Sequence, residues 1–527
     1  MRYHLTSERC VNVARKSRQL TGLLPRHENM NKAHGFNRSL LPTLLGSGAA
    51  VLIITAIAAA VAPDHAAASD LTVLHSFGYQ PDGEYPEGRL VQGGDGTLYG
   101  TTYQGGVNGY GMAFSIAPDG SLTTLHSFSG ADGQQLDTGM TFGSDGDLYG
   151  TTPQGSSCVD SNCTSFGGTV FKLTKAGALT TIDYFAGNGL PTGSAPGDLI
   201  RGGDGYFYGT TAYGGAAGTS GLGTVFKVGP NGKLTTLHSF TSAEPFYPMS
   251  GLTLGADGNF YGAAQSGPGN TNGAIFMITP AGVVTTVHSF DGADGAYPGG
   301  KLLLARDGNF YGTTGGGGTS GAGTIYRLTP SGTLTTLYAF NGDGEGPAAG
   351  LVQAADGNLY GVTSGGGASN GGTLFRVTLS GALTTLHLFT FADGLNPDVG
   401  PILGSNGSLY GTATEGGGGN GILPTGTVFQ FDLAAPHPPV LSLTTVCFNE
   451  LGECLPPWDS FVGGYAGLVW YSANVHDCQA SGRWHGTKQT GGSIEFETLI
   501  PGSHTYTLTC TSASGPVTAS TTITVGP

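Results

Sequence analysis

The chain has few charged residues, and few of those are basic once the first forty positions are passed. Asp, Glu, Lys and Arg make up 10% of the 527 residues, and eight of the 20 Lys and Arg residues lie before residue 40. From residue 70 onward, 12 basic residues stand against 32 acidic ones. Such a surface repels nucleic acid and anionic lipid, so we expect no nucleic-acid partner.

Long apolar runs are missing after residue 62. Nothing later approaches the roughly 18 apolar residues of a membrane-spanning helix. The one long apolar run, Leu40–Ala62, follows the basic segment and precedes Asp64–Ser69, whose small residues suit a signal peptidase. This order predicts a signal peptide and leader over residues 1–69, with translation starting at Met1 or Met30. The alternative is a retained membrane anchor.

The short motifs of several enzyme classes are also lacking. No Cys/His cluster has the spacing of zinc ligands. No Gly-x-Ser-x-Gly segment comes with a credible Asp and His, and no glycine-rich stretch leads into Gly-Lys-Ser/Thr. The paired carboxylates of glycoside cleavage, about 5–9 Å apart, leave no trace in sequence. An enzyme is therefore less expected than a binding protein, but it is not excluded.

Cysteine is scarce but regularly placed. Cys10 belongs to the predicted leader, and the other six cysteines fall into three closely spaced pairs. In an exported protein this arrangement predicts disulfides, with metal binding as the weaker alternative. The predicted pairs are Cys158 with Cys163, Cys447 with Cys454, and Cys478 with Cys510.

Glycine, by contrast, is abundant, with 96 residues that separate short runs of aromatic and aliphatic residues. A Leu/Phe-Tyr-Gly motif recurs about every 50 residues, a period in the range of propeller blades. Its tyrosines are Tyr99, Tyr149, Tyr208, Tyr261, Tyr311, Tyr360 and Tyr410.

Each repeat contains four strand-like runs, named a to d in chain order. In the repeat that begins at Gly300 they span 301–305, 309–314, 323–329 and 333–340. The runs are rich in Thr, Tyr, Phe and β-branched residues, and Asp-Gly or Ser-Gly turns connect a to b and c to d. Four short antiparallel strands per repeat predict the blade of a β-propeller.

The two ends of the repeat array are out of phase. The first run, Leu71–Phe77, is a d run with no a, b or c run before it, and the last repeat lacks a d run. The orphan run fits that vacancy, whereas an open solenoid would instead need caps. We therefore predict an all-β fold: a seven-bladed β-propeller over residues 70–434, with the N-terminal strand closing blade 7.

The repeated pattern Gly-Thr-Val-Phe-Lys-Leu-Thr, Leu-Thr-Thr-Leu-His-Ser-Phe and Asp-Gly-x-Leu-Tyr-Gly-Thr-Thr resembles the GloVer tandem repeat over about residues 71–432. That family occurs in exported bacterial proteins whose C-terminal sorting signals differ. The resemblance implies a propeller-like exported protein and brings no established activity or catalytic residues. The chain ends Thr522–Pro527 without an apolar tail, so we expect no C-terminal anchor. The expected location is secreted, periplasmic or at the cell surface.

Residues 440–527 change character after a proline-rich linker at 435–439. They contain fewer glycines and strand-like runs at 467–472, 493–497, 504–510 and 517–525. The segment resembles bacterial Ig-like domains, and Cys478 and Cys510 match that family's paired cysteines. This resemblance implies a small Ig-like β-sandwich, a module that usually acts as a spacer or adhesive unit.

Candidate ligand-binding residues lie in the d–a loops, on the face that also carries the b–c loops. A recurring carboxylate in these loops suggests calcium or another hard cation; the alternative is the Asp of an ordinary Asp-Gly turn. The positions are Asp82, Asp132, Glu244, Asp294, Asp343 and Asp393, with Asn188 in the third repeat.

Tyrosines accompany these carboxylates and suit stacking on sugar rings or gripping a peptide. Tyr85, Tyr247 and Tyr297 each precede a proline in the d–a loops, and the b–c loops add Tyr103, Tyr110 and Tyr213. Packing against the next blade is the alternative. Histidines also recur, within the d runs, where a blade-to-blade hydrogen bond is the expected role. They are His75, His126, His238, His288 and His387.

Three functions are consistent with this pattern. The first is a non-catalytic exported scaffold that binds a glycan, peptide or envelope partner. The second is a secreted glycan lyase or hydrolase with acids at the central channel. The third is a purely structural or adhesive module. Near-uniform repeats favour the first and third, because an active site usually makes one or two blades deviate; the insertion at 158–163 makes the second repeat the most divergent.

Overall fold

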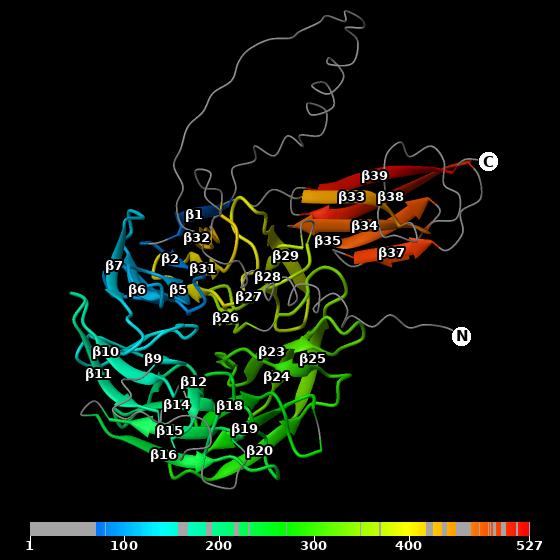
Figure 1. Cartoon of the computed structure of the whole chain (residues 1–527). Helices are drawn as coiled ribbons and strands as arrows, with labels where there is room; N and C mark the ends of the chain where they lie inside the picture. Colours follow the sequence, from blue (N-terminus) through cyan, green and yellow to red (C-terminus); the bar gives the residue numbers. More distant parts are fainter. Residues whose placement is uncertain are drawn as a thin grey trace, which may run out of the picture. The chain divides into compact units, whose positions relative to one another are not determined.

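The computed structural model describes most of residues 70–525, and within them every regular element is a strand (Figure 1). No helix in the described part of the chain is long and apolar enough to cross a membrane. The predicted leader, 1–69, and linker, 435–439, lie outside the described residues. The other gaps are 80, 156–166, 186–191, 216–220, 230–231, 270, 348, 368–369, 418–424, 449–464, 474, 483, 485, 489–491, 497–501, 513–514 and 526–527.

Seven antiparallel sheets follow one another along residues 70–434, each with strands in the predicted a-b-c-d order. They are numbered first to seventh along the chain. The first is β3 (Val91–Gln92), β4 (Leu98–Thr102), β6 (Met112–Ile116) and β7 (Leu122–Ser127); the second is β8 (Thr141–Phe142), β9 (Leu148–Thr152), β10 (Thr169–Leu173) and β11 (Leu179–Tyr184); the third is β13 (Ile200–Arg201), β14 (Phe207–Tyr213), β15 (Thr224–Val228) and β16 (Leu234–Ser239).

The remaining four sheets repeat the same plan. The fourth is β17 (Thr253–Leu254), β18 (Phe260–Ala264), β19 (Ala274–Ile278) and β20 (Val284–Ser289); the fifth is β22 (Leu303–Leu304), β23 (Phe310–Gly316), β24 (Thr324–Leu328) and β25 (Leu334–Ala339); the sixth is β26 (Val352–Gln353), β27 (Leu359–Thr363), β28 (Thr373–Val377) and β29 (Leu383–Leu388); the seventh is β30 (Ile402–Leu403), β31 (Leu409–Ala413), β32 (Thr427–Phe431) and β1 (Leu71–Ser76).

The recurring Tyr and the Asp of the Asp-Gly turn together stabilise five of the seven sheets. The Tyr311 hydroxyl donates a 2.8 Å hydrogen bond to Asp307 Oδ2, while Asp307 Oδ1 accepts from the backbone amide of Asn309. The same tyrosine–aspartate pair recurs in the second, third, fourth and sixth sheets. The Leu/Phe-Tyr-Gly motif that defines the sequence period therefore stabilises a turn and is not a ligand site.

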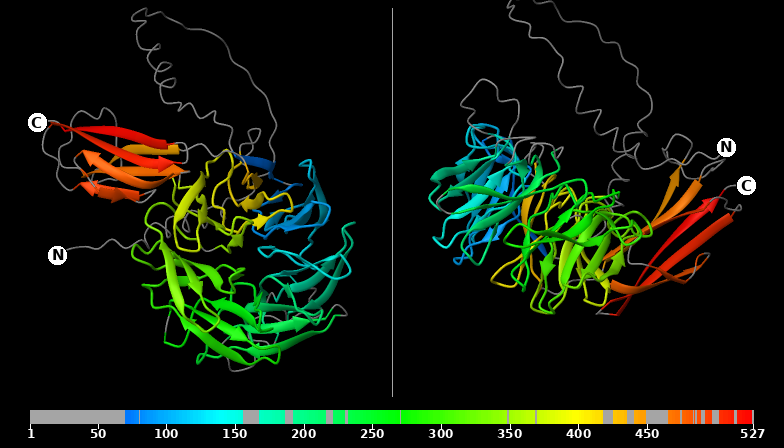
Figure 2. Two further views of the ribbon diagram at one scale, coloured as in Figure 1. Left: turned by 180° about the vertical axis from the view of Figure 1, so that it is seen from behind. Right: turned by 90° about the horizontal axis from the view of Figure 1, so that it is seen from below.

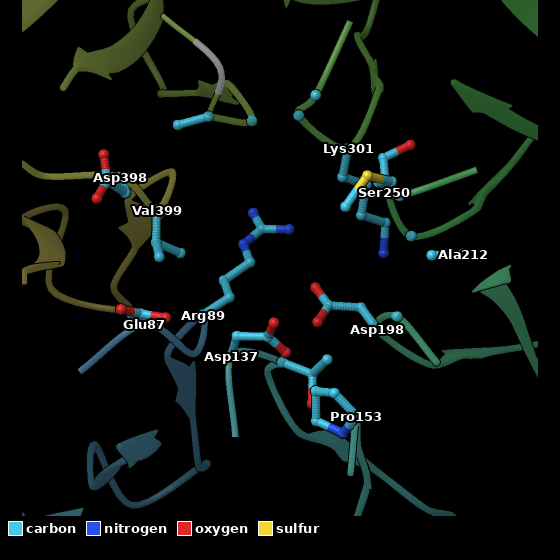
Figure 3. A pocket seen from close by; sticks show the side chains of 18 of the residues that line it. Glu87, Arg89, Asp137, Pro153, Asp198, Ala212, Ser250, Lys301, Asp398 and Val399 are labelled. Carbon is cyan, nitrogen blue, oxygen red and sulfur yellow. The ribbon is translucent and has the colours of Figure 1, made fainter. Parts of the chain in front are cut away.

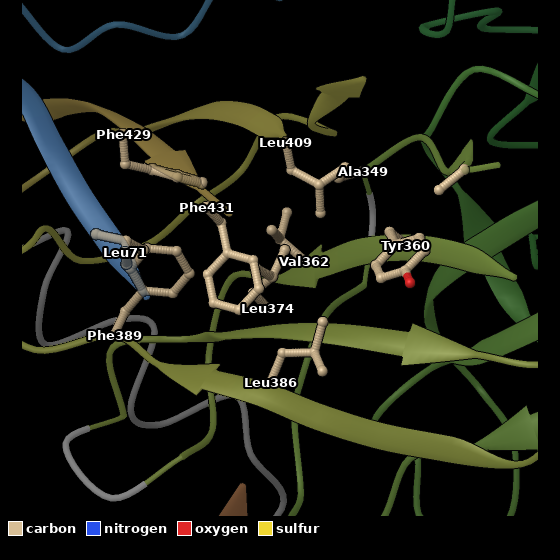
Figure 4. Close-up of a cluster of buried hydrophobic side chains, with 11 residues drawn as sticks. Leu71, Ala349, Tyr360, Val362, Leu374, Leu386, Phe389, Leu409, Phe429 and Phe431 are labelled. Atoms are coloured by element: carbon tan, nitrogen blue, oxygen red, sulfur yellow. The ribbon is translucent and has the colours of Figure 1, made fainter. Parts of the chain in front are cut away.

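The first strand of the chain belongs to the last sheet. β1 runs antiparallel to β32, with Leu71 opposite Phe431, and the amide of Phe77 donates to the carbonyl of Gly426 at 2.9 Å. Figure 4 shows Leu71 packed among Phe389, Phe429 and Phe431. The orphan run therefore occupies the vacant d position, as its phase predicted.

Hydrophobic clusters connect each sheet to the next. One cluster, for example, joins Tyr99 and Phe128 of the first repeat to Leu148 and Phe171 of the second. The seventh and first repeats are joined in the same way, because Phe77, Tyr410 and Val428 of the seventh sheet pack against Leu90 and Leu98 of the first. Figure 2 shows the blue first strand beside the yellow-orange strands of the last repeat.

Residues 440–525 form two further sheets. One is β33 (Val440–Phe448), β34 (Tyr465–Ala473) and β37 (Gly492–Phe496); the other is β36 (Gly486–Lys488), β35 (Val475–Gly482), β38 (Gly502–Ser512) and β39 (Gly515–Val525). The two sheets share a core, in which Trp470 of β34 lies edge-to-face with Trp484, between β35 and β36. The predicted Cys478–Cys510 disulfide is present and joins β35 to β38 of the same sheet. Cys158, Cys163 and Cys454 lie outside the described residues, and the Ig-like assignment stays a prediction.

Candidate functional site

The loops that carry the candidate residues pair with one another in each repeat. The d–a loop strand β2 (Gly83–Glu84) pairs with β5 (Gln104–Gly105) of the b–c loop. In the third and fifth repeats, β12 (Ser194–Pro196) and β21 (Ala296–Pro298) pair with the extended second strand. The other repeats use single bridges between the same two loops. The two loop classes therefore lie side by side.

Five of the six predicted loop carboxylates bind a histidine of the preceding strand. His288 Nε2 lies 2.8 Å from Asp294 Oδ2, and the amide of Asp291 donates to Asp294 Oδ1 at 3.0 Å. Each carboxylate thus ties its own loop to its own sheet. The equivalent pairs, at 2.8–3.2 Å, are His75–Asp82, His126–Asp132, His238–Glu244 and His387–Asp393.

Two repeats use other partners. After the fifth sheet, the hydroxyl of Tyr338 in β25 donates to Asp343, which is buried. In β11 of the second sheet, Asp183 takes the place of the histidine and accepts a 2.9 Å hydrogen bond from the amide of Leu234. Asn188 lies outside the described residues.

These carboxylates are held apart from one another, each beside its own partner. Among the described residues, no three His, Cys, Asp or Glu side chains gather as a metal-ligand group. Calcium binding by these loops therefore stays a prediction, and the geometry that the structure gives them is that of a turn anchor.

Three of the predicted tyrosines share an unusual backbone conformation. Tyr85, Tyr247 and Tyr297 have φ values of 57°, 59° and 57°, in the left-handed region that non-glycine residues seldom adopt. The same conformation recurs at the equivalent residues Gln135, Ala195, Gly346 and Asn396, so it belongs to every repeat and does not single out the tyrosines. Tyr297 is 52% exposed, and Tyr247 lies edge-to-face with the exposed Tyr213, with ring centres 5.7 Å apart.

A cavity of about 410 Å³ lies beside the residues that precede the first strand of several sheets. Residues from all seven repeats line it, and Tyr213 and Met249 contribute an exposed aromatic ring and an exposed thioether. Six charged side chains line it as well. They are Glu87, Arg89, Asp137, Asp198, Lys301 and Asp398.

Figure 3 shows how these side chains are directed. Arg89 extends into the middle of the cavity. Asp198 and Lys301 point into it from one wall, and Asp137 points into it beside Arg89. None of the six was among the residues predicted from the sequence.

Arg89, Asp198 and Lys301 occupy the same position in their repeats. Each lies two residues before the a strand of its sheet, which is β3, β13 or β22. The other four repeats have glycine at this position. These glycines are Gly139, Gly251, Gly350 and Gly400. This departure from glycine is the signal in the sequence that would have identified the site.

The glycines leave room for the charged side chains. A Cβ atom built on Gly139 would lie 3.0 Å from the Cβ of Arg89, and one built on Gly251 would lie 2.9 Å from the Cβ of Asp198. The amide of Gly139 also donates a 2.7 Å hydrogen bond to Asp198 Oδ1. Glycine and charge at this position are thus parts of one arrangement.

The cavity perturbs the acids and bases that line it. Loss of bulk water raises the pKa of Asp137 to about 7, and the carboxylate of Asp198 adds to the rise. Asp137 is nevertheless accessible through the cavity, so its carboxylate stays partly hydrated. Desolvation lowers the pKa of Lys301 to about 8, assisted by repulsion from Arg89 and opposed by Asp198.

A second cavity, of about 530 Å³, is lined by Arg89, Asp198 and Lys301 as well. These three residues therefore stand between two cavities and contribute to both. The arrangement can bind an anion through the two cations, and it can accept hydrogen bonds through the carboxylates.

These features define an all-β repeat protein with a charged cavity lined by every repeat. The Gloeobacter/Verrucomicrobia repeat matches residues 64–166, 159–306 and 296–443. The chain belongs to this family, which confirms the resemblance to GloVer repeats. A comparison with curated proteins finds no match.

Several solved structures are similar over large parts of the chain. A gluconolactonase from Xanthomonas campestris is 14% identical, with 55% of this chain and 85% of that chain covered and a TM-score of 0.35. A putative 6-phosphogluconolactonase from Bacteroides uniformis is 16% identical (60% and 88% covered, TM-score 0.42). PorZ, a surface component of the Porphyromonas gingivalis type-IX secretion system, is 13% identical (83% and 59% covered, TM-score 0.40). Similarity at this level assigns no activity.

Proposed function

We propose that the seven sheets are the blades of a closed β-propeller. Three observations support this. β1 completes the sheet of β30–β32, hydrophobic clusters link each repeat to the next and the seventh to the first, and all seven repeats line one cavity. Closure by β1 gives the seventh sheet the same four strands as the others, so β32 is not left as an open edge.

We further propose that this propeller is an exported, non-catalytic binding protein that holds a polar glycan or peptide in the cavity. One observation carries the proposal: charge replaces glycine in three of seven equivalent positions, and all three charged side chains line the cavity. The tyrosine–aspartate and histidine–carboxylate hydrogen bonds recur from repeat to repeat, as structural features do. A feature confined to three repeats and directed at one space is instead expected of a ligand site.

The aromatic side of the cavity favours a glycan. Tyr213 is 42% exposed, Met249 is 47% exposed, and both line the cavity. Contact with Tyr247 orients the ring of Tyr213. An oriented tyrosine beside hydrogen-bonding carboxylates suits a sugar, whose ring has apolar faces and a hydroxylated rim.

Binding to glycan and peptide arrays tests the proposal. Residues 70–527 are compared with a variant that carries Arg89→Gly, Asp198→Gly and Lys301→Gly, which restores the glycine of the other repeats. The matched control changes the exposed Arg306, Asp119 and Lys233 to glycine. We expect the triple variant to lose its ligand and the control to keep it. No bound ligand of either class would refute the proposal.

A glycan lyase or hydrolase is the second candidate. The observation in its favour is Asp137, whose pKa near 7 suits proton transfer at neutral pH. Turnover of array-positive glycans, measured by reducing ends and by absorbance of unsaturated products, tests it. Activity that Asp137→Asn abolishes would establish the enzyme, and bound but uncleaved ligands would leave the binding protein.

Export and the Ig-like nature of residues 440–527 belong to the same proposal. The basic segment, the apolar run and the small residues at 64–69 support cleavage of a leader. Intact-mass measurement of the protein from culture medium and envelope fractions tests this, with a start near residue 70 expected. Retention of residues 1–69 in a membrane fraction would favour the anchor instead.

A further inference from the structure

We propose that Arg89 and Lys301 form a carboxylate site within the cavity, so that the preferred ligand is an acidic sugar such as a uronic acid unit. This inference deepens the proposed function and rests on it. It names the chemical group that the cavity selects.

The carboxylate of Asp198 attracts both cations, but it forms no direct ion pair with either of them. Within the described residues, neither Arg89 nor Lys301 takes part in a hydrogen bond or an ion pair, and both side chains are partly buried. Charged groups removed from bulk water are normally paired, because their lost hydration must be replaced. Here the cavity is open to the group that would replace it.

The two cations also share one space. Repulsion from Arg89 contributes to the lowered pKa of Lys301, and both side chains reach the cavity in Figure 3. An anion bound by both would remove this repulsion. The glycine positions provide the necessary room, since a Cβ on Gly139 would meet Arg89.

The acids of the cavity decide which anion fits. Glu87, Asp137, Asp198 and Asp398 line the same space, so a phosphate dianion would meet more repulsion than a monovalent carboxylate. A carboxylate is also planar and matches the guanidinium fork. The surrounding carboxylates then accept hydrogen bonds from donors on the same ligand, and sugar hydroxyls are such donors.

Calorimetric titration of residues 70–527 tests the inference with defined probes. Trigalacturonate is compared with its neutral methyl ester, with triglycine and with inorganic phosphate. We expect trigalacturonate to bind at least tenfold more tightly than each of the others. Arg89→Met and Lys301→Met should each weaken its binding about tenfold to hundredfold, as expected for a hydrogen-bonded charge. Arg306→Met, at an exposed site, should leave binding unchanged.

The outcomes separate the inference from the proposed function. Equal binding of the acid and its ester, or tighter binding of phosphate or triglycine, overturns the carboxylate-sugar site while a cavity ligand still exists. Binding that Arg89→Met and Lys301→Met leave intact also overturns it. Absence of any ligand on the arrays overturns the proposed function as well. Thermal unfolding of each variant shows that it is folded, and Arg89→Lys, which keeps the charge without the fork, should recover part of the affinity.

Discussion

The Oδ1 atom of Asp198 accepts a 2.7 Å hydrogen bond from the backbone amide of Gly139, which lies one repeat earlier. The glycine of one repeat thereby positions the charge of the next. A Cβ at Gly139 would lie 2.8 Å from the carbonyl oxygen of Arg89 and 3.0 Å from its Cβ. The inner positions of three repeats are therefore coupled.

Gly139→Ala should disturb this coupling. We expect a loss of about 1–3 kcal/mol in the free energy of unfolding, as for other overpacked sites, together with weaker binding of trigalacturonate because Arg89 is displaced. Gly203→Ala is the matched control, since a Cβ there has no neighbour within 4 Å. Thermal unfolding and calorimetry measure both effects. Equal behaviour of the two variants would contradict the coupling.

Ligand affinity should fall as pH rises from about 6 to 9. Asp137 loses its proton near pH 7 and adds a negative charge beside the ligand carboxylate. Lys301 loses its positive charge near pH 8. Both changes act in the same direction, so the two signs do not cancel. Desolvation raises the pKa of Asp398 to about 6, so this carboxyl loses its proton at the lower end of the range and acts in the same direction. The other charged groups that line the cavity are Glu87, Arg89 and Asp198.

Two variants separate the two titrations. Asp137→Asn should flatten the profile around pH 7, and Lys301→Arg, which stays protonated, should preserve binding at pH 9. Calorimetric titration across pH 5–9 provides the measurement. A wild-type affinity that stays constant over this range would show that neither group lies beside the ligand.

Asp294→Ala should destabilise the protein without any link to calcium. The substitution removes the partner of His288 Nε2 and of the Asp291 amide, a loss of about 1–3 kcal/mol. Addition of a chelator to the wild-type protein should leave its melting temperature unchanged. A melting temperature that falls with chelator and recovers with calcium would instead support the cation-loop hypothesis.

Removal of β1 should open the seventh sheet. A chain that starts at residue 78 lacks the strand that pairs with β32, whereas one that starts at residue 70 keeps it. We expect the shorter chain to aggregate through the exposed edge of β32. Addition of a peptide spanning Leu71–Phe77 should restore solubility. Size-exclusion chromatography and thermal unfolding compare the chains, and a monomeric, cooperatively unfolding shorter chain would refute closure.

The Cys478–Cys510 disulfide should stabilise residues 440–527 selectively. The cysteines are 32 residues apart, and a loop of this length corresponds to about 4 kcal/mol. All three tryptophans of the chain lie after residue 439, so tryptophan fluorescence reports on this region alone. Cys478→Ala with Cys510→Ala should lower its unfolding midpoint, and Cys158→Ala with Cys163→Ala should not. Equal midpoints would contradict a stabilising role.

Local patterns predicted the repeat well. The Asp-Gly turn and Tyr311 lie four residues apart and bond directly, so their spacing is visible in sequence. The a strands were predicted too long. Residues 301–305 contain only the two-residue strand β22. Lys301 lines the cavity and Leu302 packs in the core, and neither pairs with the next strand. In the C-terminal region, β33, β35 and β36 were not predicted.

The cavity escaped prediction for a geometric reason. Arg89, Asp198 and Lys301 are about one hundred residues apart in sequence, and they share a cavity because equivalent positions of different repeats line one space. The carboxylates of the d–a loops were more conspicuous because they recur. Recurrence in this protein marks structural roles, whereas ligand contacts are expected where a repeat departs from the others.

The pairing of β1 with β32 also orders events in time. β1 is synthesised before every strand of the seven sheets, and its partner is synthesised last among them. β1 therefore stays unpaired until the other strands of the array have been synthesised. The β1–β32 pairing joins the two most distant strands of the array, so it is a slow step of folding. A prematurely terminated chain lacks β32 and leaves β1 without a partner. Completion of the last sheet thus distinguishes chains that include β32 from shorter fragments, which proteases and chaperones can recognise by their exposed strand.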